Sequence, residues 1–296
     1  MKLERGVSRI RASGPSFRDA SHRTYRVFFS VVFISMAVRC AVIPLGRMAD
    51  LTDLLATDVG PWNVLPPLTS PALAETLRWV AVAACLVAAT RIRPAFTATL
   101  ACLLVVAQAA FLRGFAHVNH TEMGAITVML ALTLSTWADA IDRASAFADP
   151  TRGGQAFFTA GLMFALTYSM AALVRVVNGG WDIVMSDSVK FWAMRNAMVD
   201  SAVNNAVRDV GWAVVHTPIA SLLEIGFLVV TLLELLAPLY LVSRAFRRLF
   251  LASMLLFHLV SGVVLGVLFT DSLVILVLFA LADLVWLPRD AARTPL

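Results

Sequence analysis

The sequence predicts an all-α, polytopic transmembrane helix bundle with about eight spans and with both termini in the cytoplasm. Hydrophobic residues make up 59% of the 296-residue chain and charged residues only 15%, against about 25% charged residues in ordinary soluble domains. Apolar runs of about 20 residues recur, which is the length a helix needs to cross a hydrocarbon core of about 30 Å. Because lipid cannot satisfy backbone N–H and C=O groups, and because the runs are continuous rather than alternating, the spans are expected to be helical.

Eight apolar segments follow one another without an internal repeat or an appended soluble domain. The last segment is short, so a tilted, re-entrant or interfacial placement is open for it as well as a full crossing. The expected spans are 26–46, 72–90, 95–112, 123–141, 156–177, 217–241, 249–268 and 272–287.

The distribution of arginine and lysine predicts the orientation of these spans. Cytoplasmic loops of membrane proteins are enriched in basic residues, and an eight-span count puts the basic-rich segments all on one side. Omitting one span would invert every later loop, so the charge pattern also supports the count. The side that is poor in basic residues, predicted to be the outer side, contains Arg47, Arg113, Lys190, Arg195 and Arg208. The rich side holds Lys2, Arg5, Arg9, Arg11, Arg18, Arg23, Arg26, Arg91, Arg93, Arg143, Arg152, Arg244, Arg247, Arg248, Arg289 and Arg293.

This orientation defines the domain organisation and the location. Residues 1–25 form a basic cytoplasmic N-terminal arm, 26–287 the transmembrane domain and 288–296 a short cytoplasmic tail. Arg39 interrupts the first apolar run and no A-x-A-like site follows, so an uncleaved first helix is expected. The high alanine and arginine use suggests a bacterial inner membrane. The lipid bilayer is the expected partner and nucleic acid is not, because the basic excess is explained by orientation.

The outward loop 178–216 is long enough to need structure of its own. Val199, Val203, Val207 and Val210 recur at helical spacing with polar residues between them. This pattern indicates an amphipathic helix in the outer interface, which either lies on the surface or caps a cavity between the spans. The three cysteines form no C-x-x-C motif and are expected to be small packing residues inside the spans.

Several ionisable residues lie inside the predicted spans, where a charge is costly and therefore indicates function. They are Arg39, Arg175, Glu224, Glu234 and His258. Each also has a purely structural interpretation. Arg175 can snorkel to the outer headgroups, Glu234 can pair with Arg244 or Arg247 across the following turn, and His258 can be a neutral core residue. If spans six and seven are antiparallel, Glu224 or Glu234 can instead approach His258.

Two histidines cluster with polar neighbours where the fourth span begins on the outer side. His117 and His120 are three residues apart, which places both imidazoles on one helical face. A metal site needs at least a third protein ligand, and none is evident nearby, so no metal is expected.

Four segments resemble the horizontally transferred transmembrane domain (HTTM) family, whose members include the membrane part of vitamin K-dependent gamma-carboxylases. The similarity runs from about residue 24 to 287, and Arg26 and the turn 58–61 also fit the family's opening segment. The four segments are Asn119-His120, the run 168–175 from Tyr168 to Arg175 that leads to Trp181, the Glu234–Pro238 helix end with its following basic turn, and Phe257-His258-Leu259.

This resemblance implies a site that acts on a reduced, vitamin K-like quinone. In the carboxylases a lysine deprotonates the hydroquinone and a histidine assists. His120 fits the histidine position and Arg175 the lysine position, so the resemblance implies these two as catalytic residues. Arginine stays charged and is a poor base, so Arg175 would instead stabilise a quinol oxyanion.

The remaining family-like positions are expected to contact the substrate. They are Asn119, Tyr168, Trp181, Glu234 and His258. The resemblance does not include the large extramembrane domain with which carboxylases hold their peptide substrates. This argues against gamma-carboxylation itself.

Two functions follow from this site and its departure from the family pattern. The first is a quinol-dependent redox or oxygenation enzyme with an outward-facing site. The second is a non-catalytic membrane subunit for the maturation, export or immunity of a secreted peptide, with a peptide or protein partner. A transporter or lipid-binding protein is a third class, but the sequence lacks paired inverted repeats. Whether the protein is an enzyme therefore stays open between the first two.

Overall fold

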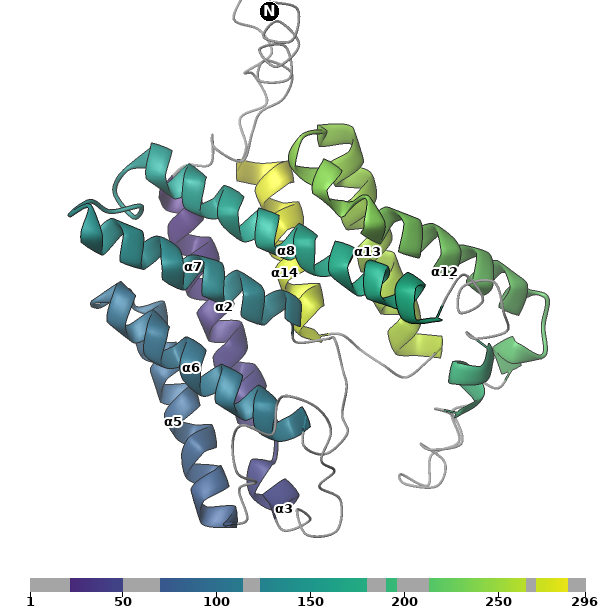
Figure 1. Cartoon of the computed structure of the whole chain (residues 1–296), viewed down its shortest axis with the longest axis horizontal. Coiled ribbons are helices and arrows are strands. Elements are labelled where there is room, and N and C mark those ends of the chain that lie inside the picture. Colours follow the sequence, from purple (N-terminus) through teal and green to yellow (C-terminus); the bar gives the residue numbers. More distant parts are fainter. Residues whose placement is uncertain are drawn as a thin grey trace, which may run out of the picture. The chain divides into compact units, whose positions relative to one another are not determined.

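The computed structural model describes residues 22–49, 70–113, 123–179, 190–195, 213–264 and 270–286. Within these ranges the chain is helical and contains no strand, which confirms the predicted all-α class (Figure 1). The described residues of each of the eight predicted apolar segments lie largely on helix. The elements are α2 (His22–Val42), α3 (Leu45–Ala49), α5 (Pro71–Ala89), α6 (Pro94–Arg113), α7 (Met123–Ile141), α8 (Pro150–Gly179), α12 (Ile219–Leu235), η3 (Ala237–Leu241), α13 (Arg244–Val264), α14 (Thr270–Leu281) and η4 (Ala282–Trp286).

Six of these helices are long and apolar enough to cross a membrane, namely α2, α5, α6, α7, α8 and α13. The other two predicted spans correspond to shorter helices. Helix α12 has 17 residues, which is at the lower limit for a crossing, and the 12 residues of α14 continue into the π-helical η4. The protein is accordingly a multi-pass membrane protein, whereas the count of eight spans and the orientation stay predictions.

Local sequence signals explain where the helices begin and end. The Ser70 hydroxyl accepts a hydrogen bond from the Leu73 N–H at 3.4 Å and Pro71 occupies the first turn of α5, which is the usual chemistry of a helix start. Helix α12 ends at Leu235, and Pro238, in the first turn of η3, lacks the N–H that a continuing helix would need.

Helix α8 is longer than the predicted span 156–177. It begins at Pro150 because the Asp149 carboxylate accepts the Thr151 N–H at 2.8 Å and a proline is favourable in the first position. Its 30 residues correspond to about 45 Å at 1.5 Å per residue. Since this exceeds a hydrocarbon core of about 30 Å, α8 has to tilt or to extend beyond the core.

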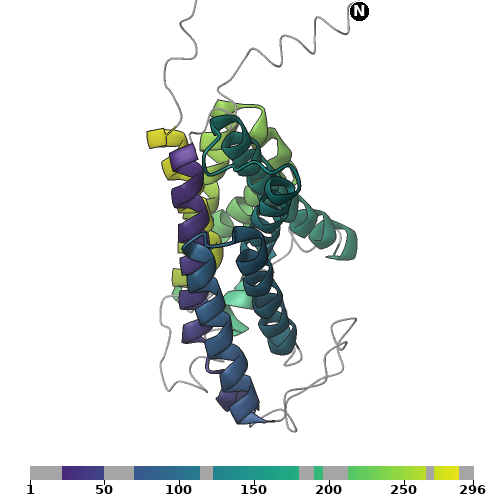
Figure 2. The same ribbon diagram turned by 90° about the vertical axis from the view of Figure 1, so that its left-hand side faces the viewer.

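The described chain divides into two compact units, whose main bodies are Pro15–Phe164 and Ala165–Asp283. In the first, here called the N-terminal unit, α2 packs along α5, α5 along α6 and α6 along α7 (Figures 1 and 2). Its interior contains aromatic rings from α2, such as Phe28, which meets Phe157 edge-to-face at 4.9 Å between centroids. Cys40, Cys85 and Cys102 are buried, as predicted for packing residues.

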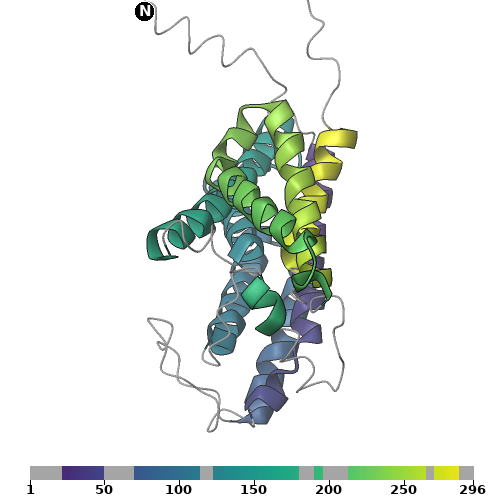
Figure 3. The same ribbon diagram turned by 90° about the vertical axis from the view of Figure 1, so that its right-hand side faces the viewer.

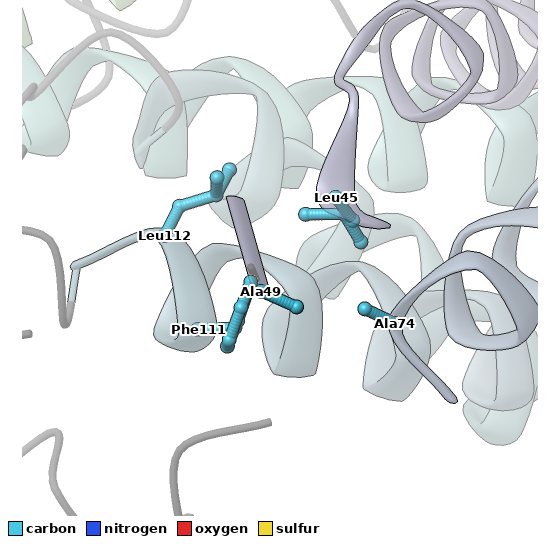
Figure 4. Close-up of a cluster of buried hydrophobic side chains, with 5 residues drawn as sticks. All are labelled: Leu45, Ala49, Ala74, Phe111 and Leu112. Carbon is cyan, nitrogen blue, oxygen red and sulfur yellow. The ribbon is translucent and has the colours of Figure 1, made fainter. Parts of the chain in front are cut away.

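A small apolar cluster holds α3 against the ends of α5 and α6 in this unit. It consists of Leu45, Ala49, Ala74, Phe111 and Leu112 (Figure 4). Beside it the Gly46 N–H donates to the Glu75 carboxylate at 3.0 Å. A Cβ at position 46 would lie 2.7 Å from the Glu75 side chain, so this close approach requires glycine.

The second body, here called the C-terminal unit, contains the later part of α8 with α12, η3, α13 and α14. Helix α13 packs against η3 and α14 (Figures 1 and 3). Tyr240 in η3 lies between Phe250 of α13 and Phe279 of α14, with ring centroids 5.7 and 5.9 Å away. These rings anchor the short connection between α12 and α13.

Three predicted extramembrane features lie mostly outside the described residues. The basic arm is described only from His22 onward, and the valine pattern 199–210 of the outward loop 178–216 and the tail 288–296 are not described at all. The predicted interfacial helix therefore stays a prediction.

Candidate functional site: a buried polar network in the C-terminal unit

Tyr168 and His258 form the centre of a buried polar network. The Tyr168 Oη and the His258 Nε2 are 2.8 Å apart, and the two rings meet edge-to-face at 6.1 Å. Both residues are buried, and Ser272 of α14 adds a side-chain hydrogen bond to Tyr168. Helices α8, α13 and α14 therefore each contribute one polar side chain to a single point in an apolar surrounding.

Arg175 and Glu234 form an ion pair beside this point. The Arg175 guanidinium donates from Nη1 to Glu234 Oε2 at 2.7 Å and to the Thr231 hydroxyl at 3.0 Å. The Glu234 side chain is only 4% exposed. The guanidinium also lies 5.0 Å from the Phe227 ring centroid, a distance at which a cation is attracted to the ring face. A buried charge is tolerated only when a countercharge compensates it, and Arg175 and Glu234 compensate each other in this way.

Ser169 links the two pairs through the backbone of α12. Its hydroxyl donates to the carbonyls of Glu234 at 3.0 Å and of Leu235 at 3.2 Å. The last carbonyls of a helix have no partner within it, so this contact satisfies the end of α12 and fixes it against α8. Tyr168 and Arg175 are seven residues apart, two helical turns, and so share one face of α8.

The arrangement combines two chemical capabilities within one helix face. A tyrosine hydroxyl bonded to an imidazole can pass a proton between oxygen and nitrogen, because each group both donates and accepts. An arginine paired with a carboxylate can hold a developing negative charge next to it. A low dielectric strengthens both interactions relative to water.

The structure thus brings together four of the seven site residues predicted from sequence: Tyr168, Arg175, Glu234 and His258. Asn119, His120 and Trp181 lie outside the described residues. The alternative pairing of Glu234 with Arg244 or Arg247 is wrong, because Glu234 binds Arg175 and Arg247 binds Asp283. The end of α12 packs against α8, so the nearest arginine comes from that helix rather than from the following turn.

Two other predicted intramembrane charges have different surroundings. Glu224 pairs with Lys190 at 3.5 Å near the start of α12 and does not belong to the network. Arg39 is buried within the N-terminal unit.

Sequence reasoning missed three hydroxyl groups and one carboxylate. Ser169, Thr231 and Ser272 complete the network, but small hydroxyl residues are frequent in membrane helices and carry no signal by themselves. Asp283 could have been found, because it is an acidic residue inside the last apolar segment. It forms ion pairs with both Arg247 and Arg248 at 3.0 Å, and it accepts a hydrogen bond from the Arg248 Nε.

Comparison of the chain with protein-family models, with curated proteins and with solved structures found no match. The geometry of the network therefore has to support any functional conclusion.

Proposed function

We propose that this membrane protein acts on a membrane-soluble quinol, with the polar network of the C-terminal unit as part of its site. The single observation that supports this proposal is the buried Tyr168–His258 hydrogen bond, formed on the same face of α8 as the Arg175–Glu234 ion pair. An isolated charge buried in a membrane protein would destabilise it. A proton-exchanging pair next to a charge-stabilising pair is the combination that quinol deprotonation requires.

The residue types of the network match the chemical groups of a quinol. A quinol is a flat aromatic ring with two opposed oxygen atoms, and it needs hydrogen-bonding groups for the oxygens and apolar contacts for the ring. The network supplies hydroxyl, imidazole and guanidinium groups, and Phe227, Phe250 and Phe257 provide ring neighbours. A bound quinol would supply two electrons and two protons to the reaction.

Within this proposal each residue has a defined task. His258 accepts a proton at Nε2, where Tyr168 now bonds it, and Tyr168 passes protons to that atom. Arg175 holds the negative charge that remains, while Glu234 and Thr231 keep its guanidinium in place. Arginine suits this task better than lysine would, because it stays charged and presents a planar fork. His120 and Asn119 would complete the site, as the HTTM resemblance implies.

Native mass spectrometry of the gently extracted protein tests this function first. A quinone that copurifies with the wild-type chain, and is lost from His258→Gln and His120→Ala while both variants still extract as folded protein, is the expected result. A Tyr25→Phe variant, altered in the N-terminal unit, is the matched control and should keep the quinone. Quinone retention by both histidine variants would contradict the proposal.

A second function is favoured by one observation. The Arg175 guanidinium is engaged by Glu234 and Thr231, so the network could serve only to hold α8 and α12 together. The protein would then be a non-catalytic membrane subunit for the maturation, export or immunity of a secreted peptide. A stoichiometric polypeptide in the same mass spectrum, without quinone, is the result that this alternative expects.

The proposed location is a bacterial inner membrane, with both termini in the cytoplasm and with His120, at the start of the fourth span, on the outer side. The positive-inside asymmetry of the loops supports it. Reporter fusions at each terminus test it, because a reporter that is active only outside the cytoplasm should stay inactive at both ends. Activity at one end only would exclude an even number of spans.

A further inference from the structure

A cluster of three arginines marks the first turn of α13. Arg244 begins the helix, and Arg247 and Arg248 follow one turn later. Asp283 lies between the last two, with Oδ1 3.0 Å from the Arg247 Nε and Oδ2 3.0 Å from the Arg248 Nε. The Arg247 and Asp283 side chains are 2% and 1% exposed, whereas Arg248 is 53% exposed.

The cluster is electrostatically unfavourable as it stands. Like charges three and four residues apart repel each other on a helix, and a helix N-terminus already carries a partial positive charge. Asp283 pairs with Arg247 and Arg248, so one carboxylate faces two guanidinium groups, and Arg244 adds a third positive charge in the same helical turn. A bound anion would relieve all of these repulsions.

The buried Asp283 carboxylate orients Arg248, which is the exposed arginine of the cluster. Because Asp283 holds the Arg248 Nε, the terminal nitrogens of Arg248 remain available at the protein surface. Arg244 makes no hydrogen bond or ion pair with any residue of the described ranges, and it lies four residues before Arg248 on the same helix face. Orientation by the positive-inside rule needs positive charge only; it does not need a carboxylate buried among the arginines.

An exposed apolar stripe continues from Arg248 along α13. Leu256, Leu259 and Val263 are exposed on it, and Ala252 lies between them and Arg248. The spacing of four, four, three and four residues keeps these positions on one side of the helix. The surface therefore presents guanidinium groups at one end and about two helical turns of hydrocarbon contact below them.

We propose that Arg244 and Arg248 bind the phosphate of an anionic phospholipid whose acyl chain lies along this α13 stripe. Arginine binds phosphate oxygens through paired N–H groups, and Arg247 with Asp283 positions Arg248 without contacting the lipid. A free phosphate shares the headgroup chemistry but gains nothing from the apolar stripe. The acyl chain is therefore the feature that distinguishes the two sources.

Lipid titrations of the full-length protein in zwitterionic phosphatidylcholine nanodiscs test this site. Phosphatidylglycerol is titrated in, and bound lipids are counted by native mass spectrometry. We expect one tightly retained phosphatidylglycerol, bound about tenfold or more weakly by the double variant Arg244→Gln/Arg248→Gln. Inorganic phosphate at equal concentration should not displace it; complete displacement would assign the site to free phosphate and overturn the lipid proposal.

Two control variants keep the test decisive. Arg91→Gln/Arg93→Gln removes two exposed arginines from the α5–α6 turn, so it has the same change in net charge and should retain the lipid. Arg244→Lys/Arg248→Lys keeps the charge but loses the paired N–H groups, so its affinity should lie between those of the wild type and the glutamine variant. An equal loss in the α5–α6 variant would mean a general surface attraction and would overturn the proposal. Lower thermal stability of the glutamine variant than of the lysine variant, with equal lipid binding by the wild type and the lysine variant, would assign the loss to a damaged fold and would also overturn it.

Discussion

The two units of the chain stabilise their interiors in different ways. In the N-terminal unit the largest buried side chains are aromatic rings from α2 and α8, and the ion pairs Glu75–Arg78 and Asp139–Arg152 involve partly exposed side chains. In the C-terminal unit the carboxylates of Glu234 and Asp283 are almost completely buried between helices. Breaking a buried pair leaves an uncompensated charge, whereas losing an exposed one costs little. We therefore expect polar groups to contribute more to the stability of the C-terminal unit than to that of the N-terminal unit.

Among the substitutions that test this contrast, Asp283→Asn should cause the largest loss of unfolding free energy. It removes the carboxylate that both Arg247 and Arg248 contact, so the free energy of unfolding should fall by about 3–5 kcal/mol. Unfolding in mixed detergent and dodecyl sulfate micelles measures it. Glu75→Gln in the N-terminal unit is the matched control and should cost far less, because exposed ion pairs contribute little. Equal losses in the two variants would remove the distinction between the units.

Substitution of Glu234 by glutamine should come next. The amide keeps the shape but leaves the Arg175 guanidinium without a countercharge, so we expect a loss of about 2–3 kcal/mol. A double-mutant cycle with Arg175→Gln isolates the pair. If the double variant is no more stable than the sum of the single changes implies, the two residues do not act as a pair.

The buried tyrosines of the two units provide a smaller and sharper comparison. Tyr168 hydrogen-bonds His258, so Tyr168→Phe should cost about 1–2 kcal/mol. The Tyr25 hydroxyl is buried without a hydrogen-bond partner among the described residues, so Tyr25→Phe should be neutral or slightly stabilising. Thermal unfolding in one detergent compares them. A greater loss for Tyr25→Phe would reverse the ranking.

The smallest effect is expected at the loop after α7. Asp142 pairs with Arg152 at 3.0 Å, but its side chain is 54% exposed. Asp142→Asn should therefore change the unfolding free energy by no more than about 0.5 kcal/mol. The same detergent titration detects it, and raising the salt concentration should reduce even this difference. A loss comparable to that of Asp283→Asn would show that burial does not govern these pairs.

The sequence predicted which segments are helical, but it predicted the helix ends less accurately. All eight apolar segments are helical because hydropathy over about 20 residues is a strong local signal. The start of α8 was placed six residues late because Asp149 and Pro150 set it through capping chemistry, whereas the prediction followed hydropathy. The shortest predicted span, 272–287, corresponds to the short helix α14. The longest, 217–241, is instead divided into α12 and η3, because Pro238 ends the regular helix.

The candidate site was predictable in its residues but not in its pairings. Tyr168, Arg175, Glu234 and His258 were recognisable as polar groups inside apolar spans or as positions of the family resemblance. Which of them meet depends on how α8, α12 and α13 pack. Sequence distance favoured Arg244 or Arg247 as the partner of Glu234, only ten or thirteen positions away in the numbering, yet the partner is Arg175 of another helix, at a separation of 59 residues.

By itself the sequence determined that this chain is a multi-helix membrane protein and which residues are costly to bury, because both follow from composition and local periodicity. Only the tertiary structure decided that Tyr168 bonds His258, that Glu234 neutralises Arg175 and that Asp283 clamps two arginines. The physical reason is that an interaction between charges depends on distances of a few ångströms. Those distances are set by packing between helices that are far apart in the chain.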